Sequence, residues 1–174
     1  SCVDDCPANP LFALDSQPGT LVAALRSAGA LLVFTIDLAV VARLWRSVQG
    51  SRWRNHEGVE SVIGPREVLV VAPYNAQVAL IKAALPTEAR VGTVDKFQGV
   101  EKPGIICSFV RNNPMCDIGF AKDPRRINVA LSRAQELLII VGCSEMFCMA
   151  DEKYVAVFNT IKEIGGDTDA LDIV

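Results

Sequence analysis

The sequence contains a single histidine, His56, and no two cysteines in a CxxC arrangement. Zinc sites are built from closely spaced cysteines and histidines, so this shortage argues against a metal centre. Cys2 and Cys6 have a CxxxC spacing, and Cys143 and Cys148 a CxxxxC spacing, with no histidine near either pair. We therefore expect reduced thiols that hold no metal, as in an intracellular protein of the cytoplasm or nucleus.

Long hydrophobic runs are missing as well. The longest apolar stretch, residues 28–42, is interrupted by Thr35 and Asp37, and it is shorter than the roughly 20 residues that span a bilayer. The N-terminal residues show no signal-peptide pattern. We therefore expect no membrane partner. Cys107 lies in a shorter apolar run, which predicts a small buried side chain.

Positive charge is not in excess, because 17 lysines and arginines face 20 acidic residues and the net charge is −3. This balance argues against a basic coat over the whole protein, although it allows a local basic groove for nucleic acid. The basic residues gather in two clusters, which are Arg43, Arg46, Arg52 and Arg54, and then Arg111, Lys122, Arg125, Arg126 and Arg133. The first cluster is most simply a solvated surface.

The length of 174 residues and the apolar fraction of 51% are typical of one globular domain with an ample core. Residues 1–20 contain three prolines and no periodicity, so they are predicted to be irregular, and the folded domain is predicted over residues 21–174. Strands are predicted at residues 31–36, 67–72, 90–94, 104–110 and 137–141. Loops are predicted at residues 49–66 and 111–122.

Helices are predicted between these strands. The first follows Asp37 and has an apolar stripe of Leu38, Val41, Ala42 and Trp45. The others are a short one at 21–27, one capped by Asn75, one with Asp123 as N-cap and Pro124 as first residue, and one at 152–164. Because the strands are continuous apolar runs that alternate with helices, the fold class is α/β, with a mostly parallel sheet covered on both faces. Ligands of such folds bind at the carboxyl ends of the strands.

The segment VGTVDKFQGVE at Val91–Glu101 follows one predicted strand. Thr93 offers a hydroxyl and an amide at the strand end, and a phosphodiester is bound by such neutral donors. Gln98 and Glu101 add an amide and a carboxylate, and a carboxylate suits a ribose hydroxyl better than a phosphate. The alternative is an ordinary polar turn in which Gly99 is the turn residue.

The segment RRINVALSRA at 125–134 places Arg126 and Arg133 seven residues apart. On a continuous helix this spacing puts both guanidiniums on one face, as a polyphosphate site would require. The alternative is a surface helix whose arginines lie over the core. Pro73 and Tyr74 open a further candidate site, because an exposed tyrosine at a strand end can stack on a base, although Pro-Tyr is also common in turns.

Three segments in this order strongly resemble superfamily 1 helicases, in particular the nonsense-mediated-decay helicase and its relatives. They are PYNAQ at 73–77, VGTVDKFQGVEKPGIICSFVRNN at 91–113 and IGFAKDPRRINVALSRAQELLIIVG at 118–142. They match helicase motifs IV, V and VI, within about 70–134, and the likeness covers about half of the chain. These motifs belong to the second, C-terminal RecA-like domain of the family, which implies a three-layer domain of the P-loop NTPase type.

For the nucleotide, the resemblance implies a role for five residues. Arg133 matches the arginine finger that contacts the γ-phosphate of ATP, and Arg126 matches an arginine that supports the nucleotide cleft. Glu101 matches the acidic residue next to the ribose, with Gln98 and Gly99 in the same motif. The cofactor implied is ATP with Mg²⁺, held mainly by the family's first RecA-like domain.

For the nucleic acid, the resemblance implies contacts with single-stranded RNA or DNA. Thr93 and Val94 match positions that face the nucleic-acid backbone. Pro73 and Tyr74 match the motif IV step near the strand, and Gln77 lies on the helix that follows. The partners implied are therefore a single strand and the first RecA-like domain of the same protein.

The sequence also departs from the family. It contains no GxxxxGK[ST] phosphate-binding loop and no acidic Walker B pair, so it encodes half of an ATP site and resembles an excised domain. We expect the C-terminal motor domain of an ATP-dependent helicase, which is inactive alone. The alternative is a non-catalytic nucleic-acid-binding or scaffolding module derived from a helicase domain. A nucleotide kinase or GTPase fold and a motor with an added nuclease domain are weaker alternatives.

Overall fold

The computed structural model describes residues 29–34, 38–55, 57–109, 119, 123–142, 155–156, 159–160, 163 and 167–169. The predictions for residues 1–28, the loop at 111–118 and the cysteines at 2, 6, 143 and 148 lie outside these residues. Of the predicted helix at 152–164, every described residue is helical. Among the described residues, no helix is long and apolar enough to cross a membrane.

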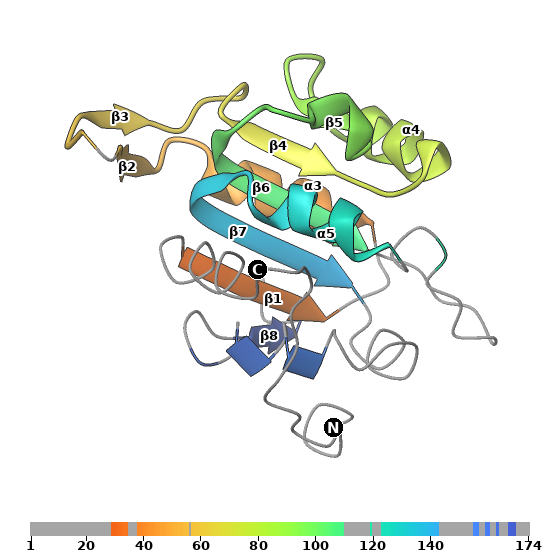
Figure 1. Cartoon of the computed structure of the whole chain (residues 1–174). Helices are drawn as coiled ribbons and strands as arrows, with labels where there is room; N and C mark the ends of the chain where they lie inside the picture. Colours follow the sequence, from red (N-terminus) through yellow and green to blue (C-terminus); the bar gives the residue numbers. More distant parts are fainter. Residues whose placement is uncertain are drawn as a thin grey trace.

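A six-stranded sheet forms the centre of the described structure, and its strands lie in the order β5-β4-β6-β7-β1-β8. Every pair of neighbouring strands in this sheet is parallel, as the continuous apolar runs predicted. The strands are β1 (Gly29–Phe34), β4 (Val68–Val71), β5 (Arg90–Gly92), β6 (Lys102–Phe109), β7 (Ala134–Gly142) and β8 (Asp167–Asp169). All the carboxyl ends therefore share one edge of the sheet, called here the carboxyl edge, and the amino ends share the opposite amino edge (Figure 1). The short strand β8 was not predicted.

Helices cover both faces of this sheet. The helix α3 (Ala39–Val48) buries Val41, Ala42 and Trp45 of the predicted stripe, while Leu38 is its N-cap and is partly buried. It ends before Gly50, whose positive φ of 79° suits the left-handed conformation that glycine adopts readily. The helix α4 (Asn75–Ala84) buries Val78 and Ile81. Its N-cap is Tyr74 rather than Asn75, because Asn75 is already the first helical residue.

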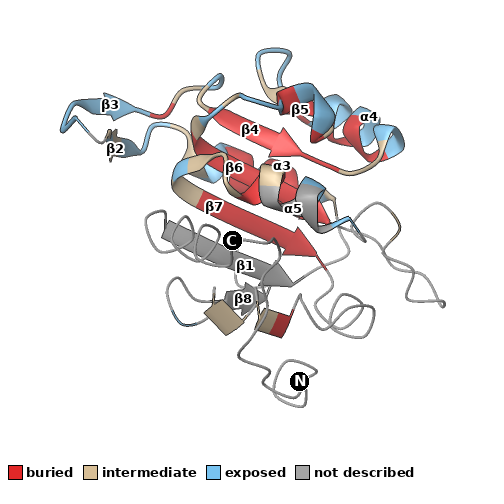
Figure 2. Ribbon diagram, viewed as in Figure 1, coloured by how far each residue is buried: buried red, intermediate tan, exposed pale blue. Residues whose placement is uncertain are grey.

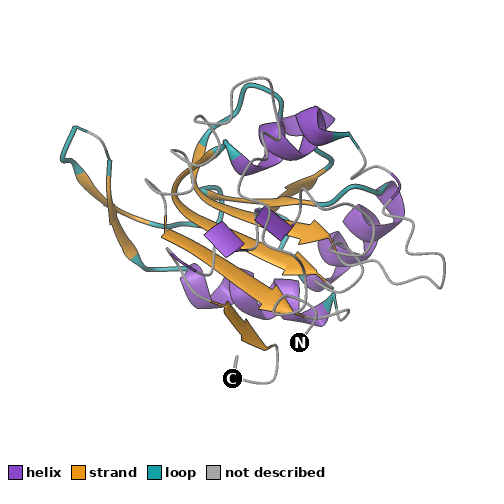
Figure 3. Ribbon diagram, turned by 60° about the horizontal axis from the view of Figure 1, so that its bottom comes forward, coloured by secondary structure: helices purple, strands orange, loops and turns teal. Residues whose placement is uncertain are grey.

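The two faces are built from alternating residues of the strands, because successive side chains of a strand point to opposite sides. Val68 and Val70 of β4 belong to the core cluster that contains the buried residues of α3 and α4. Leu69 and Val71 line the opposite face, against α5 (Pro124–Leu131) and a short 3-10 helix η1 (Asp95–Phe97). The middle of the sheet is buried on both faces (Figure 2), and the helices lie outside it (Figure 3). This arrangement confirms the α/β fold class.

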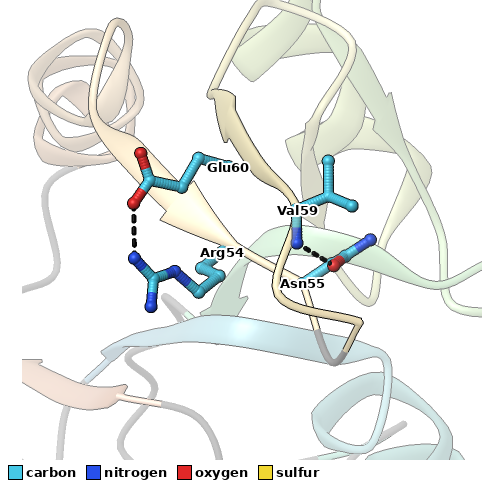
Figure 4. A network of polar contacts seen from close by, with 4 residues as sticks. All are labelled: Arg54, Asn55, Val59 and Glu60. Atoms are coloured by element: carbon cyan, nitrogen blue, oxygen red, sulfur yellow. Dashed lines mark hydrogen bonds and ion pairs between the residues drawn. The ribbon is translucent and has the colours of Figure 1, made fainter.

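The predicted loop at 49–66 contains a hairpin instead. Its strands β2 (Arg52–Arg54) and β3 (Glu60–Val62) are antiparallel and project from the body of the domain (Figure 1). The Oδ1 atom of Asn55 accepts the N–H groups of Glu57 at 3.0 Å and Val59 at 2.8 Å, which closes the turn, and Arg54 pairs with Glu60 (Figure 4). The strands escaped prediction because β3 is exposed along its whole length and has no apolar alternation.

A pair of substitutions tests whether both faces of the sheet are packed. Ile105 and Ile106 are neighbours on β6 that are 0% and 1% exposed and belong to opposite faces. We expect Ile105→Ala and Ile106→Ala each to lower the free energy of unfolding by about 2–5 kcal/mol, because each leaves a cavity in a separate core. Urea denaturation measures the loss, with Leu80→Ala as the control, since Leu80 is 61% exposed. A small loss at only one isoleucine would contradict a sheet packed on both faces.

The burial of Cys107 gives a second prediction. Cys107 lies on β6 and is 0% exposed, and burial raises the pKa of its thiol from 9.0 to about 12. The folded thiol therefore stays neutral at pH 8, and a neutral thiol is a poor nucleophile. We expect peptide mapping after iodoacetamide treatment at pH 8 to find Cys107 unlabelled in the native protein and labelled in urea. The thiolate favours the unfolded state, so the contribution of Cys107 to stability declines from pH 9 upward.

Candidate functional site

Two segments lie side by side on the face of the sheet that is opposite α3 and α4. One is the segment from Thr93 to Glu101, which leads from the end of β5 to the start of β6, and the other is α5. Side chains of both segments line a small apolar cavity over β4 and β6, where Phe97 and Ala130 are 4% and 2% exposed. Both segments therefore pack on the same apolar surface of β4 and β6.

The segment from Thr93 to Glu101 is folded by its own backbone. The carbonyl of Thr93 accepts the N–H of Lys96 at 3.1 Å, and the carbonyl of Phe97 accepts the N–H of Val100 at 3.0 Å. Gly99 has a φ of 80°, which confirms the prediction that it is the turn residue. Because β5 and β6 are parallel, the segment begins at the carboxyl edge with Thr93 and ends at the amino edge with Glu101.

The helix that carries Arg126 ends before Arg133, so the prediction of two arginines on one helical face is wrong. The helix α5 stops at Leu131, and Ser132 and Arg133 form a turn into β7. The cause is strand pairing, because the N–H of Lys102 donates to the carbonyl of Arg133 at 3.1 Å where β6 and β7 begin to pair. The two arginines lie near opposite ends of a helix that is about 12 Å long.

Arg133 and Glu101 meet at the amino edge. The Nη1 atom of Arg133 lies 3.8 Å from the Oε1 atom of Glu101, and their side chains are 24% and 56% exposed. The Nε atom of Arg133 is buried and has no hydrogen-bond partner among the described residues. Arg133 therefore presents a positioned guanidinium whose hydrogen-bonding capacity is only partly used.

Arg126 lies in a different setting, near the start of α5. Its Nε atom is 3.8 Å from the Oδ2 atom of Asp123, and both side chains are about half exposed. Arg126 also lines an open hollow of about 170 Å³ together with the polar residues Asp95 and Gln98. The structure thus brings Arg126 to Gln98, and Arg133 to Glu101.

The candidate nucleic-acid residues lie at the carboxyl edge. Pro73 and Tyr74 follow β4, Thr93 follows the neighbouring strand β5, and all three are partly exposed. Val94 is 3% exposed and packs beneath α5, so almost none of it is available to a ligand. Gln77 is 9% exposed and points into the domain.

Two further sets of charged residues escaped the sequence reasoning. Lys102 lies with its Nζ atom 3.4 Å from the Oε1 atom of Glu67 at the amino edge, close to Arg133. Arg90 and Lys96 both lie over the ring of Phe97. The Glu67–Lys102 contact joins residues far apart in the sequence, and the Phe97 contacts form across the turn between β5 and η1, so no helix or strand periodicity signals either set. In the described part of the chain, no group of three or more His, Cys, Asp or Glu residues could hold a metal ion.

Comparison with known proteins matches residues 38–145 to a family described as an AAA domain. DNA polymerase alpha-associated DNA helicase A of Schizosaccharomyces pombe is 42% identical over 97 residues, which are 54% of this chain and 15% of that protein. A regulator of nonsense transcripts 1 homolog of Neurospora crassa is 38% identical over 96 residues, which are 49% of this chain and 9% of that protein.

A putative helicase mov-10-B.2 of Danio rerio is 35% identical over 126 residues, which are 62% of this chain and 12% of that protein. The matched part thus spans less than a sixth of each of these relatives. These relatives confirm the resemblance to superfamily 1 helicases related to the nonsense-mediated-decay helicase. Because the family model matches more than half of its residues, over both the central strands and α5, the chain belongs to the AAA domain family.

Proposed function

We propose that residues 21–174 form the second RecA-like motor domain of an ATP-dependent superfamily 1 helicase that works inside the cell. The observation that carries this proposal is the pairing of Glu101 with Arg133 at the amino edge. The N–H of Lys102 hydrogen-bonds the carbonyl of Arg133 where two parallel strands pair, so the guanidinium is attached to a fixed backbone. An arginine that stabilises charge in a transition state needs a fixed backbone, because its donors must already lie where the charge develops.

The residues at the amino edge fit part of a nucleotide. The Arg133 side chain is 24% exposed, so the end of its guanidinium can donate to phosphate oxygens, and Glu101 is exposed enough to accept hydrogen bonds from ribose hydroxyls. The described residues do not fit Mg²⁺, since they offer no cluster of carboxylates. The proposal therefore assigns Mg²⁺ and most of the ATP contacts to a first RecA-like domain, with Arg133 reaching across the cleft.

Arg126, Gln98 and Gly99 support the same cleft from a second position. Arg126 lies in the first turn of α5 beside Asp123, and Arg133 lies beyond the end of that helix beside Glu101, so the two arginines serve different contacts. Arg126 and Gln98 line the same hollow, and Gly99 turns the chain from that hollow toward Glu101. In this role Arg126 orients the cleft while Arg133 acts on the γ-phosphate.

Single-stranded RNA or DNA binds at the opposite edge in this proposal. Tyr74 offers a ring for base stacking, and Thr93 offers donors to a phosphodiester, while the buried Val94 supports Thr93 from beneath. The segment from Thr93 to Glu101 then touches nucleic acid at one end and nucleotide at the other. Closure of the cleft on ATP would move both ends together, which is how hydrolysis would drive translocation. The helicase names of the relatives support this reading.

The first test concerns the chain alone. We expect the purified 174-residue protein to hydrolyse ATP no faster than a buffer blank, because it contains no GxxxxGK[ST] loop and only half of the proposed site. A coupled ATPase assay with and without single-stranded RNA measures this, and a parallel preparation of Arg133→Ala controls for contaminating ATPases. Robust turnover that disappears in the variant would overturn the half-site proposal.

The second test uses a protein in which this domain is joined to a phosphate-binding-loop domain. We expect Arg133→Ala to lower kcat for ATP by about 10³–10⁵-fold, because an arginine finger acts mainly in the transition state. Single-strand affinity should stay nearly unchanged, since Arg133 lies at the edge opposite Thr93. Steady-state kinetics and fluorescence anisotropy give the two values, with Arg66→Ala as an exposed control at the same edge. Unchanged turnover would remove the finger assignment and favour the non-catalytic module.

A further inference from the structure

Two cations rest on one aromatic ring beside β5, the edge strand of the sheet. The guanidinium carbon of Arg90 lies 5.7 Å from the centre of the Phe97 ring, and the Nζ atom of Lys96 lies 5.9 Å from the same centre. Phe97 itself is only 4% exposed, so these side chains and the sheet cover its ring. The electron-rich face of the ring attracts each cation, so one buried ring positions both charges.

Gly92 explains how Lys96 reaches this position. A Cβ atom at Gly92 would lie 2.7 Å from the Cδ atom of Lys96, so the missing side chain leaves the space that the lysine stem occupies. The φ of Gly92 is not in the left-handed region, which means that space and not backbone conformation favours glycine here. The η1 turn, closed by the hydrogen bond from Lys96 N–H to the carbonyl of Thr93, directs the stem over Gly92.

Neither cation takes part in an ion pair within the described part of the chain. Glu88 and Asp95, the acidic residues nearest to them in sequence, form no ion pair with either cation. Both charges thus lack a carboxylate partner in the described part of the chain, and an anion that binds beside Phe97 is attracted by both. The arrangement therefore favours a negatively charged ligand beside β5, the outermost strand of the sheet.

We propose that Arg90 and Lys96 form a phosphate-binding site for the backbone of the single-stranded nucleic acid. This inference rests on the proposed function and extends it to two residues outside the candidate site. Lys96 is hydrogen-bonded through its backbone to Thr93, and β5 is the neighbour of β4, which leads to Tyr74. A strand that passes Tyr74 and Thr93 at the carboxyl edge thus continues along β5, where the two cations contact its phosphates.

The test measures binding of a fluorescent 12-nucleotide single strand, as RNA and as DNA, to the 174-residue protein over a range of salt concentrations. We expect Lys96→Gln and Arg90→Gln each to weaken binding roughly 3–10-fold and to reduce the slope of log K against log salt by about 0.7, the value for one phosphate contact with a single strand. Lys82→Gln is the matched control, because Lys82 is an exposed lysine on α4 and its loss changes the net charge equally. Equal effects of Lys82→Gln and Lys96→Gln would overturn the site, since they would reflect net charge alone.

A second variant moves the lysine without changing any charge. Gly92→Ala places a methyl group 2.7 Å from the Lys96 stem and 3.0 Å from the Phe97 ring, so it displaces the lysine and presses on the ring that holds it. We expect it to weaken binding at least as much as Lys96→Gln while circular dichroism shows a folded protein. Binding by Gly92→Ala at the wild-type level, with Lys96→Gln also unchanged, would overturn the proposal. If Thr93→Val and Tyr74→Ala weaken binding in the same experiment, the proposed function stands and only this site fails.

Competition with inorganic tripolyphosphate separates nucleic acid from a free polyphosphate. We expect tripolyphosphate to displace the oligonucleotide only weakly, because it lacks the bases that stack on Tyr74. Tight binding of tripolyphosphate that is lost in Arg90→Gln and Lys96→Gln would assign the site to a free polyphosphate and overturn the nucleic-acid assignment. If the 174-residue protein binds no oligonucleotide even at low salt, this site and the nucleic-acid part of the proposed function both fail.

Discussion

The pairing of β6 with β7 is the constraint on which the rest of the candidate site depends. The N–H of Lys102 donates to the carbonyl of Arg133, and from there the two strands run in parallel register to Phe109 and Gly142. This pairing ends α5 at Leu131 and sets the entrances of both strands side by side. Glu101 and Arg133, which immediately precede these strands, are neighbours for that reason.

The same pairing also fixes where the segment from Thr93 to Glu101 ends. The segment starts beside β5 and must reach the start of β6 at the opposite edge, so it crosses the face of the sheet next to α5. Phe97 is buried at its middle and fixes it to the core, while the polar residues on either side of Phe97 remain exposed. In the proposed motor, this rigid crossing links nucleotide at Glu101 to nucleic acid at Thr93.

Much of the fold could be predicted because its signals are local. The apolar runs predicted five of the strands, the stripe from Leu38 to Trp45 predicted α3, and Pro124 marked the first residue of α5. The hairpin of β2 and β3 could not be predicted, since its strands are short, exposed and stabilised by the Asn55 turn and by pairing with each other. The seven-residue spacing of Arg126 and Arg133 misled for a related reason, because spacing carries no information on where a helix ends.

The sequence by itself determined the alternation of strands and helices, the turn at Gly99 and the identity of the polar residues near the strand ends. Only the tertiary structure decided which of those residues meet. Arg133 lies beside Glu101, outside the helix, because its backbone pairs with β6 at Lys102. Val94 is buried because α5 covers it. Arg90 and Lys96 lie over one ring because the chain turns after Gly92 and brings Phe97 back beside β5, and residue spacing gives no signal of that turn.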